Sequence, residues 1–547
     1  MSREVESHLA LIPDHLRQRG SSSNLVNARL HEVKTTPLFS SKVKAILQDS
    51  QDGAGVFSQY GVLGLRLQTY GNGSKSDSRA DSEPETDRLV YGNITAPWSA
   101  FVCGSQGSGK SHTLSCLLEN ALLSPSRAGR LTNPLSAIVF HYDKFTAFAS
   151  TQLCEAAYLC SAGIPVRVLV SPSNLHTMQR LYANMPGIPA SAPKPRVIPM
   201  YFCEQHLNIS MMKTLMGIGG GENHTPLYME MVMKILREMA CECRGTSGLN
   251  YLLFKQRLQT EKFIGGQDAP LKMRLQLLES FLVLPGKEKG VPSDTWKFEP
   301  GTLTIVDLSC PFVDENDACA LFNICLSLFL ENRHEGGRLV ALDEAHKFLT
   351  INSSEAVEFT ETLLSVIRQQ RHLATRVVIA TQEPTLSPSL LDLCNVTIVH
   401  RFTSPAWFKA LAGHLAGALI GKRQGVKNGA EEEDGEPVRL FDRIVTLSTG
   451  EALVFCPTAM LDVVDEANDG SATDDSDAVK SDPGSDTETS TDSAPSLQEL
   501  GPRYVRVRIR ARVTVDGGCS ILAEGTAPSP GDISIDVRYP SYQFNSE

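Results

Sequence analysis

The sequence predicts an α/β protein in which a largely parallel central sheet is flanked by helices. From about residue 89 onward, short apolar runs of strand length alternate with amphipathic runs of helix length. The apolar runs are continuous, as in parallel strands that are buried on both faces. A glycine-rich loop follows one of these runs, and two adjacent carboxylates follow another.

The expected elements are distributed along the whole middle of the chain. We expect strands at Ser99–Cys103, Ala137–His141, Val166–Val170, Val197–Phe202, Leu303–Leu308, Leu339–Leu342, Val377–Ala380, Val396–Val399 and Ala452–Phe455. We expect helices at Tyr228–Ala240, Leu271–Leu284, Ala318–Glu331 and Val357–Gln370.

Composition breaks divide the chain into four regions. Residues 1–90 show little periodicity and end in a polar run that we interpret as a loop, so their fold is not predicted. Residues 91–462 form the expected core, with a helical insertion at about 207–284, where strand signals are few. Residues 463–500 form an acidic segment, and residues 501–547 are expected to return a strand to the core.

The stretch Phe101–Leu114, FVCGSQGSGKSHTL, contains a phosphate-binding loop (P-loop). Residues 104–111 match G-x-x-x-x-G-K-[ST] at every fixed position, between an expected strand and an expected helix. This context disfavours an ordinary Gly/Ser turn. Backbone N–H groups and the helix N-terminus would cradle phosphate. The expected nucleotide-binding residues are Gly104, Ser105, Gln106, Gly107, Ser108, Gly109, Lys110, Ser111 and His112. Lys110 would contact the β- and γ-phosphates, and the Ser111 hydroxyl would bind Mg²⁺.

Two carboxylates, Asp343 and Glu344, end the apolar run Arg338–Leu342. In an open α/β sheet the carboxyl end of such a strand faces the ligand. We expect Asp343 to hold Mg²⁺ together with Ser111, and Glu344 to act as the base that polarises the attacking water. An acidic pair after an apolar run also marks helix starts, so the motif alone is weak. In an alternating chain with a P-loop it favours ATP hydrolysis.

A third motif carries a family resemblance. The stretch from Arg371 through Thr381-Gln382-Glu-Pro384 to the strand ending at Arg401 resembles the HerA–FtsK group of ring ATPases. That group carries an arginine shortly before a strand that ends in Thr-Gln-x-Pro, then a leucine pair, Cys-Asn and another apolar strand. The likeness extends to the strands around Asp307 and Gly450, and covers the core of about 91–460.

The resemblance implies a RecA-like, Mg²⁺-dependent P-loop ATPase that assembles as a homo-oligomeric ring, for instance a hexamer. Gln382 would then contact the γ-phosphate or the attacking water, and Arg371 would be an arginine finger that reaches a neighbouring subunit's site. The alternatives are that Gln382 only caps a strand and that Arg371 is a solvated cation at a helix end. Three further residues, Arg368, Arg376 and Arg401, compete for the finger role.

Three jobs stay open for such an ATPase. It translocates or remodels DNA, as the resemblance implies; it moves or remodels protein, as secretion-type relatives do; or it is a nucleotide-gated scaffold with slow turnover. The basic loop at residues 421–427 is the best candidate for a DNA contact, and a solvated loop is the plainer interpretation.

Net charge does not exclude DNA. The chain has a net charge of −11, but residues 463–500 hold eleven acidic residues and one lysine, so ten of these charges belong to that segment. Its composition is poor in apolar residues and predicts a disordered linker, with a regulatory tail as the alternative. After it, an expected edge strand carries alternating arginines at Arg506, Arg508, Arg510 and Arg512. They are either solvated charges that prevent pairing at the sheet edge or a binding surface.

The remaining features favour an intracellular protein. No apolar run approaches the roughly 20 residues that a membrane span needs, and the first residues do not resemble a secretion signal. The thirteen cysteines are scattered through strand-like and helix-like runs. We therefore expect buried free thiols and a reducing compartment, either nucleus or cytoplasm.

Overall fold

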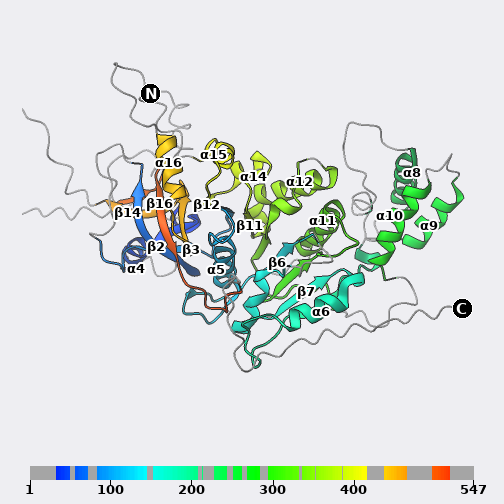
Figure 1. Ribbon diagram of the computed structural model, residues 1–547, viewed down its shortest axis with the longest axis horizontal. Helices are drawn as coiled ribbons and strands as arrows, with labels where there is room; N and C mark the ends of the chain where they lie inside the picture. Colours follow the sequence, from blue (N-terminus) through cyan, green and yellow to red (C-terminus); the bar gives the residue numbers. More distant parts are fainter. Residues whose placement is uncertain are drawn as a thin grey trace, which may run out of the picture.

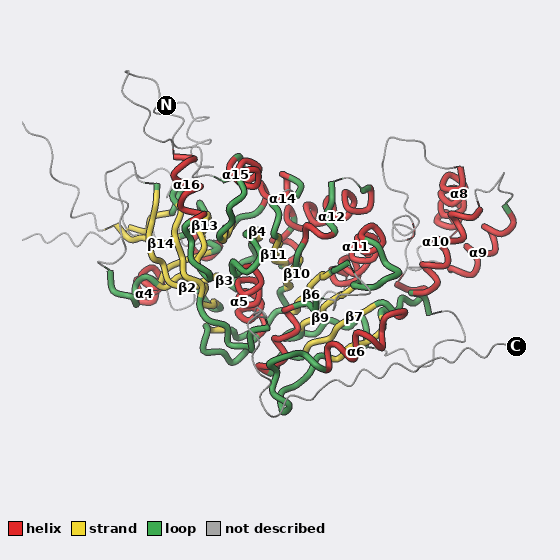
Figure 2. Tube along the Cα trace, in the orientation of Figure 1, coloured by secondary structure: helices red, strands yellow, loops and turns green. Residues whose placement is uncertain are grey.

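The computed structural model describes residues 32–49, 56–71, 83–144, 152–206, 212, 227–242, 250–261, 268–283, 294–331, 336–351, 353–384, 386–415, 436–464 and 496–517. One long sheet runs through the molecule, and helices cover it on both sides (Figure 1). Figure 2 shows the same arrangement by secondary structure, with the strands in the middle layer.

The sheet has the strand order β15-β14-β1-β3-β2-β16-β13-β12-β4-β11-β10-β6-β9-β7-β8, and the short β5 pairs with β2. In chain order the strands are β1 (Leu38–Ser40), β2 (Tyr60–Tyr70), β3 (Leu89–Asn93), β4 (Ser99–Cys103), β5 (Gly129–Arg130), β6 (Ser136–His141), β7 (Val166–Val170), β8 (Arg196–Pro199), β9 (Leu303–Asp307), β10 (Arg338–Leu342), β11 (Thr375–Thr381), β12 (Val396–His400), β13 (Glu451–Phe455), β14 (Met460–Val464), β15 (Ser496–Glu499) and β16 (Tyr504–Ile509).

From β12 to β8 every neighbouring pair is parallel. From β12 to β3 the pairs are antiparallel. The prediction of a largely parallel central sheet is therefore confirmed for the half that carries the three motifs. Several of its strands, for instance β4, β6 and β10, are buried along their whole length, which explains their continuous apolar sequences.

Helices cover the two faces of the parallel half. The helices of the structure are α4 (Ser41–Asp49), α5 (Lys110–Leu122), α6 (Leu175–Ala183), α8 (Leu227–Glu242), α9 (Tyr251–Thr260), α10 (Asp268–Ser280), α11 (Glu315–Glu331), α12 (Ser354–Arg368), α13 (Gln370–Leu373), α14 (Pro388–Leu393), α15 (Pro405–Ala412) and α16 (Glu436–Val445). One hydrophobic cluster joins the sheet to α5 and α6, and a second joins its other face to α11, α12 and α14. The expected helical insertion is confirmed in its described part by α8, α9 and α10, which lie together at one end of the molecule (Figure 1).

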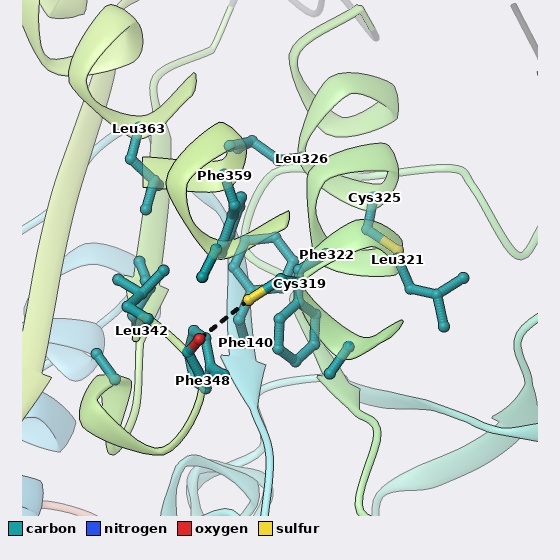
Figure 3. Packing of buried hydrophobic residues seen from close by; sticks show 14 of the residues in the cluster. Phe140, Cys319, Leu321, Phe322, Cys325, Leu326, Leu342, Phe348, Phe359 and Leu363 are labelled. Atoms are coloured by element: carbon teal, nitrogen blue, oxygen red, sulfur yellow. Dashed lines mark hydrogen bonds between the residues drawn. The ribbon is translucent and has the colours of Figure 1, made fainter. Parts of the chain in front are cut away.

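An aromatic cluster fixes the loop that follows β10. Phe348 lies just after the one-turn helix η5 (Ala345–Lys347), and its ring packs edge-on against Phe322 of α11, with centroids 5.1 Å apart. Phe140 of β6 and Phe359 of α12 complete the group (Figure 3). The Cys319 thiol donates to the Phe348 carbonyl at 3.2 Å. The two carboxylates before η5 are therefore held by a rigid, buried anchor.

The N-terminal region belongs to the same sheet. Strands β1, β2 and β3 lie between β14 and β16, so the boundary expected near residue 90 falls inside β3. Position 64 shows how closely the strands approach: a Cβ there would lie 2.2 Å from the Arg508 carbonyl oxygen. The glycines that permit this approach also interrupt the apolar periodicity by which strands are recognised.

The expectation of an edge strand after the acidic segment is wrong. Strand β16 pairs with β13 on one side and β2 on the other, so it lies inside the sheet. The acidic segment is shorter than expected, because β14 extends to Val464 and β15 begins at Ser496, and these strands pair with each other. Residues 465–495, and with them most of the expected linker, lie outside the described residues.

Most described cysteines are buried, and all are free thiols, as expected. Within the described ranges, no helix has the length and apolar character that crossing a bilayer requires.

Candidate functional site

The three motifs meet at one edge of the sheet. Strand β11 lies between β4 and β10 and is parallel to both. The P-loop follows β4, Gln382 follows β11, and Asp343 and Glu344 follow β10. Because the carboxyl ends of parallel strands meet at the same edge, residues separated by more than 230 positions become neighbours.

The P-loop has the left-handed backbone that its glycines permit. Gly104 has a φ of 154°, and a Cβ there would lie 2.6 Å from the His400 Cβ. Gly109 precedes α5 with a φ of 113°. The Lys110 ammonium donates to the Ser105 carbonyl at 3.1 Å, across the loop. The loop is thus preformed, with its lysine folded over the cradle.

A buried histidine supports the loop from below. The Thr113 hydroxyl of α5 lies 2.9 Å from His400 Nε2, while His400 Nδ1 lies 2.9 Å from the Glu451 carbonyl oxygen. The carbonyl oxygen can only accept, so Nδ1 carries the proton and Nε2 accepts from Thr113. Burial lowers the pKa of His400 to about 4, so this ring is neutral and holds α5 against β12 and β13.

Electrostatics couple Lys110 to the carboxylates. Burial lowers the pKa of Lys110, and the charges of Glu344 and Asp343 partly oppose this effect. Asp343 itself is buried, and its Oδ2 lies 3.3 Å from His141 Nδ1. Burial lowers the pKa of His141, but Asp343 and Asp307 outweigh it and raise the value to about 9. His141 is therefore a cation at neutral pH that pairs with Asp343.

Cys154 completes a buried group around Asp343. The ligand atoms of His141, Cys154 and Asp343 lie within 4.8 Å of one another. Burial and the charge of Asp343 raise the pKa of Cys154 well above its ordinary value, so the thiol is protonated beside the His141–Asp343 pair. We interpret the group as an ion pair that orients Asp343.

Glu344 is held in a conformation that aims it into the site. Its φ of 50° is left-handed, which is rare for a residue with a Cβ and is typical of functional positions. Gln382 Nε2 donates to Glu344 Oε1 at 2.8 Å. Glu344 Oε2 is buried and accepts no hydrogen bond from the described residues.

His346 explains why that oxygen stays free. Its Nδ1 lies 3.5 Å from Glu344 Oε2 but accepts a hydrogen bond from the Gln382 backbone N–H at 3.4 Å. Burial lowers the pKa of His346, so the ring is neutral and has no proton on that nitrogen. Glu344 Oε2 is therefore an acceptor without a donor, as a general base requires.

A cavity of about 760 Å³ lies over these residues. The expected site residues Gln106, Gly107, Gly109, Lys110, Ser111, His112, Glu344 and Gln382 line it. Gln152, Glu155 and residues 449–450, 508–511 and 516–517 also line it, and the sequence does not predict these as site residues. Arg508 and Arg510 belong to the alternating arginines of the sequence, and this pattern does not indicate that the end of β16 lies beside the P-loop.

Each of the four C-terminal arginines pairs with a carboxylate of the chain. Arg506 and Arg508 both donate to the Glu451 carboxylate. Arg510 pairs with Glu119 of α5 at 2.7 Å, and Arg512 lies 3.8 Å from Glu155.

The candidate finger arginines lie in different places. Arg371 is exposed on α13, before β11, whereas Gln382 follows the same strand. The seven residues of β11 separate them by about 20 Å. Arg368 is exposed at the end of α12. Arg376 is only 3% exposed and donates to the Ile94 and Ala96 carbonyls. The Arg401 carbonyl accepts from Ser105 N–H, beside the chain's own P-loop.

No protein-family model matches the sequence, and a comparison with curated proteins returned no match. Among solved structures, VirB4 of Thermoanaerobacter pseudethanolicus is similar over 72% of this chain and 94% of its own length, with 11% identity and a TM-score of 0.42.

Two viral proteins are also similar. The DNA-packaging ATPase B204 of Sulfolobus turreted icosahedral virus matches 65% of this chain and 92% of its own, with 10% identity and a TM-score of 0.26. The genome-packaging NTPase B204 of Sulfolobus turreted icosahedral virus 2, in complex with ATP-gammaS, matches 30% and 65%, with 12% identity and a TM-score of 0.20. At these identities, function is to be inferred from the geometry of the site and not from the likeness.

Proposed function

We propose that this protein is a Mg²⁺-dependent ATPase of the HerA–FtsK type that works as a homo-oligomeric ring. The observation that carries the proposal is the hydrogen bond of 2.8 Å between Gln382 and Glu344, at the sheet edge that also holds the P-loop. It joins a residue suited to sensing the γ-phosphate to a residue suited to activating water. A P-loop that only bound nucleotide would not need this pair.

Each residue has a definite task in hydrolysis. Backbone N–H groups of residues 104–111 and the Lys110 ammonium bind the phosphates and orient the γ-phosphate. Glu344 Oε2, which lacks a donor, accepts a proton from the attacking water. Gln382 keeps Glu344 Oε1 occupied, so the free oxygen faces the water. His346 is neutral and does not compete for that oxygen.

The oxygen ligands present fit Mg²⁺. Ser111 lines the cavity, and Asp343 follows β10, which is separated from β4 by β11. A hydroxyl and a carboxylate are hard donors of the kind that Mg²⁺ takes together with phosphate oxygens and water. When bound, the ion would neutralise charge on the β- and γ-phosphates. His141 holds Asp343 in place through the contact at 3.3 Å.

The position of Arg371 supports the proposed ring assembly. At about 20 Å from Gln382, across the length of β11, it does not serve its own site. An exposed arginine at the opposite edge of the sheet is suited to reach a neighbouring subunit. Arg376 is unsuited because its guanidinium is buried and binds two carbonyls.

We further propose DNA as the substrate that the ring moves, on the basis of the sequence resemblance. The candidate DNA loop at residues 421–427 lies outside the described residues. The test is the rate of ATP hydrolysis with and without duplex and single-stranded DNA, over a range of salt. Stimulation by DNA that falls steeply with salt supports translocation. Turnover indifferent to DNA but stimulated by a protein partner supports a protein-moving role, and ATP binding without turnover supports a scaffold.

A further inference from the structure

The C-terminal segment 508–517 runs along α5, with contacts from His112 near its start to Asn120 near its end. Glu119 of α5 is fully buried and accepts hydrogen bonds from the backbone N–H of Val513 at 3.0 Å and of Thr514 at 2.9 Å. The Thr514 hydroxyl donates to it at 2.6 Å, and Arg510 donates at 2.7 Å. A buried carboxylate with this many donors fixes the segment firmly.

The same segment is continuous with the P-loop. The Gly450 N–H donates to the Ser108 carbonyl at 3.3 Å, and the Ile509 N–H donates to the Gly450 carbonyl at 2.9 Å. On the other side, His112 Nε2 donates to the Arg510 carbonyl at 2.8 Å. The wall of the cavity therefore runs from the P-loop through Gly450 to residues 509 and 510 without a break.

The chemistry of the cavity distinguishes its two ends. Lys110, Glu344 and Gln382 mark the end that suits phosphate and water, as the proposed function requires. The wall made by residues 509–511 presents the aliphatic Ile509 and Ala511. The cavity volume of about 760 Å³ is within the usual range of pockets for small molecules, and it exceeds what the phosphates alone would fill.

Arg508 adds a flat, charged surface to this wall. Its side chain is 62% exposed, and it donates to Glu451 through one nitrogen, at 2.8 Å. A planar guanidinium stacks well on aromatic rings, including those of nucleobases. An aliphatic wall beside such a group suits a nucleoside better than it suits another phosphate.

We propose that the nucleoside half of the nucleotide binds against residues 508–511, so that the C-terminal segment is part of the nucleotide site. This rests on the proposed function, since it assumes that the P-loop holds the phosphates. The segment returns to the core only after the acidic region. Its hydrogen bonds to Glu119 attach it to α5, the helix that follows the P-loop. Nucleotide binding thus requires a docked C-terminal segment.

The test separates the nucleoside from the phosphates. Ala511→Trp places a bulky ring at an exposed position of the cavity wall, so the fold should tolerate it. Gln498→Trp, an exposed position of β15 outside the cavity, is the matched control. Binding of ATP and of inorganic tripolyphosphate, each with Mg²⁺, is measured by calorimetry on the full chain. Thermal unfolding shows that both variants are folded.

We expect Ala511→Trp to weaken ATP binding about tenfold or more and to leave tripolyphosphate binding unchanged within about twofold. Gln498→Trp should change neither. Unchanged ATP binding in Ala511→Trp would overturn the proposal, and so would an equal loss for both ligands, because the segment would then act on the phosphates. If the wild-type protein binds neither ligand, or if Lys110→Ala binds both as the wild type does, the proposed function itself fails.

Discussion

Removing the carboxylate of Glu119 is expected to loosen the C-terminal segment. In Glu119→Ala the backbone N–H groups of Val513 and Thr514 lose their acceptor, and Arg510 loses its ion-pair partner. Removing one partner of a buried ion pair lowers the free energy of unfolding by about 3–5 kcal/mol. Arg510 keeps hydrogen bonds to Asn120 and Cys116, so we expect the lower end, about 3 kcal/mol. Against a total stability of about 5–15 kcal/mol, this loss is large.

The assay is urea denaturation followed by circular dichroism. Glu242→Ala is the matched control, because Glu242 is an exposed glutamate that pairs with Arg257 at 2.6 Å. The control should leave the denaturation midpoint unchanged, since exposed pairs contribute little. A midpoint for Glu119→Ala equal to that of the wild type would refute the reasoning.

The difference in the free energy of unfolding between the wild type and Glu119→Ala should also depend on pH. Burial raises the pKa of Glu119, but hydrogen bonds from Thr514, Val513 and Arg510 outweigh it and lower the pKa below its ordinary value of 4.5. A lowered pKa in the folded state contributes stability that is present above about pH 4.5 and is lost as the pH falls through the folded value. The difference in stability between the two proteins should therefore become smaller in acid. A difference that is constant from pH 7 to pH 3 would contradict this.

Three further predictions concern the nucleotide site, the ring and the acidic segment. Lys110→Ala should abolish ATP binding in calorimetry, because it removes the cation that contacts the phosphates; retained affinity would contradict the P-loop assignment. Arg371→Ala and Glu344→Gln should each be nearly inactive but should regain ATPase activity when mixed, because a trans arginine contributes about 10³–10⁵ in turnover in known cases. If subunits exchange, as a size measurement shows, and the mixture stays inactive, Arg371 is not the trans finger. Replacing residues 465–495 by a short Gly/Ser linker should leave basal ATPase activity unchanged, because their composition offers no core; lost activity would show a structural role.

The parallel half of the fold was predictable because its strands are recognisable as apolar runs in the sequence. Strands such as β4 and β10 are buried on both faces, so each is an unbroken apolar run, and the motif residues follow them directly. A parallel arrangement brings their carboxyl ends to one edge, so Lys110, Glu344 and Gln382 could be placed at the same edge from sequence. The observed order β4-β11-β10 then makes them neighbours.

The antiparallel half was not predictable for equally physical reasons. Strand β2 contains Gly61 and Gly64, which admit close neighbours but break the apolar pattern. The alternating arginines of β16 look like an exposed face, because a sequence does not show that Glu451 and Glu119 will lie opposite them. Long-range ion pairs of this kind depend on register, which local periodicity does not fix.

The central claim is that Glu344 activates water at a site where Lys110 binds ATP. The most direct test is to measure ATP binding and ATP hydrolysis side by side in the wild type and in Glu344→Gln, with the same protein preparations. Our account predicts equal binding and a loss of turnover of about 10²–10⁴-fold, because the amide cannot accept the proton. Hydrolysis by Glu344→Gln at the wild-type rate would contradict it.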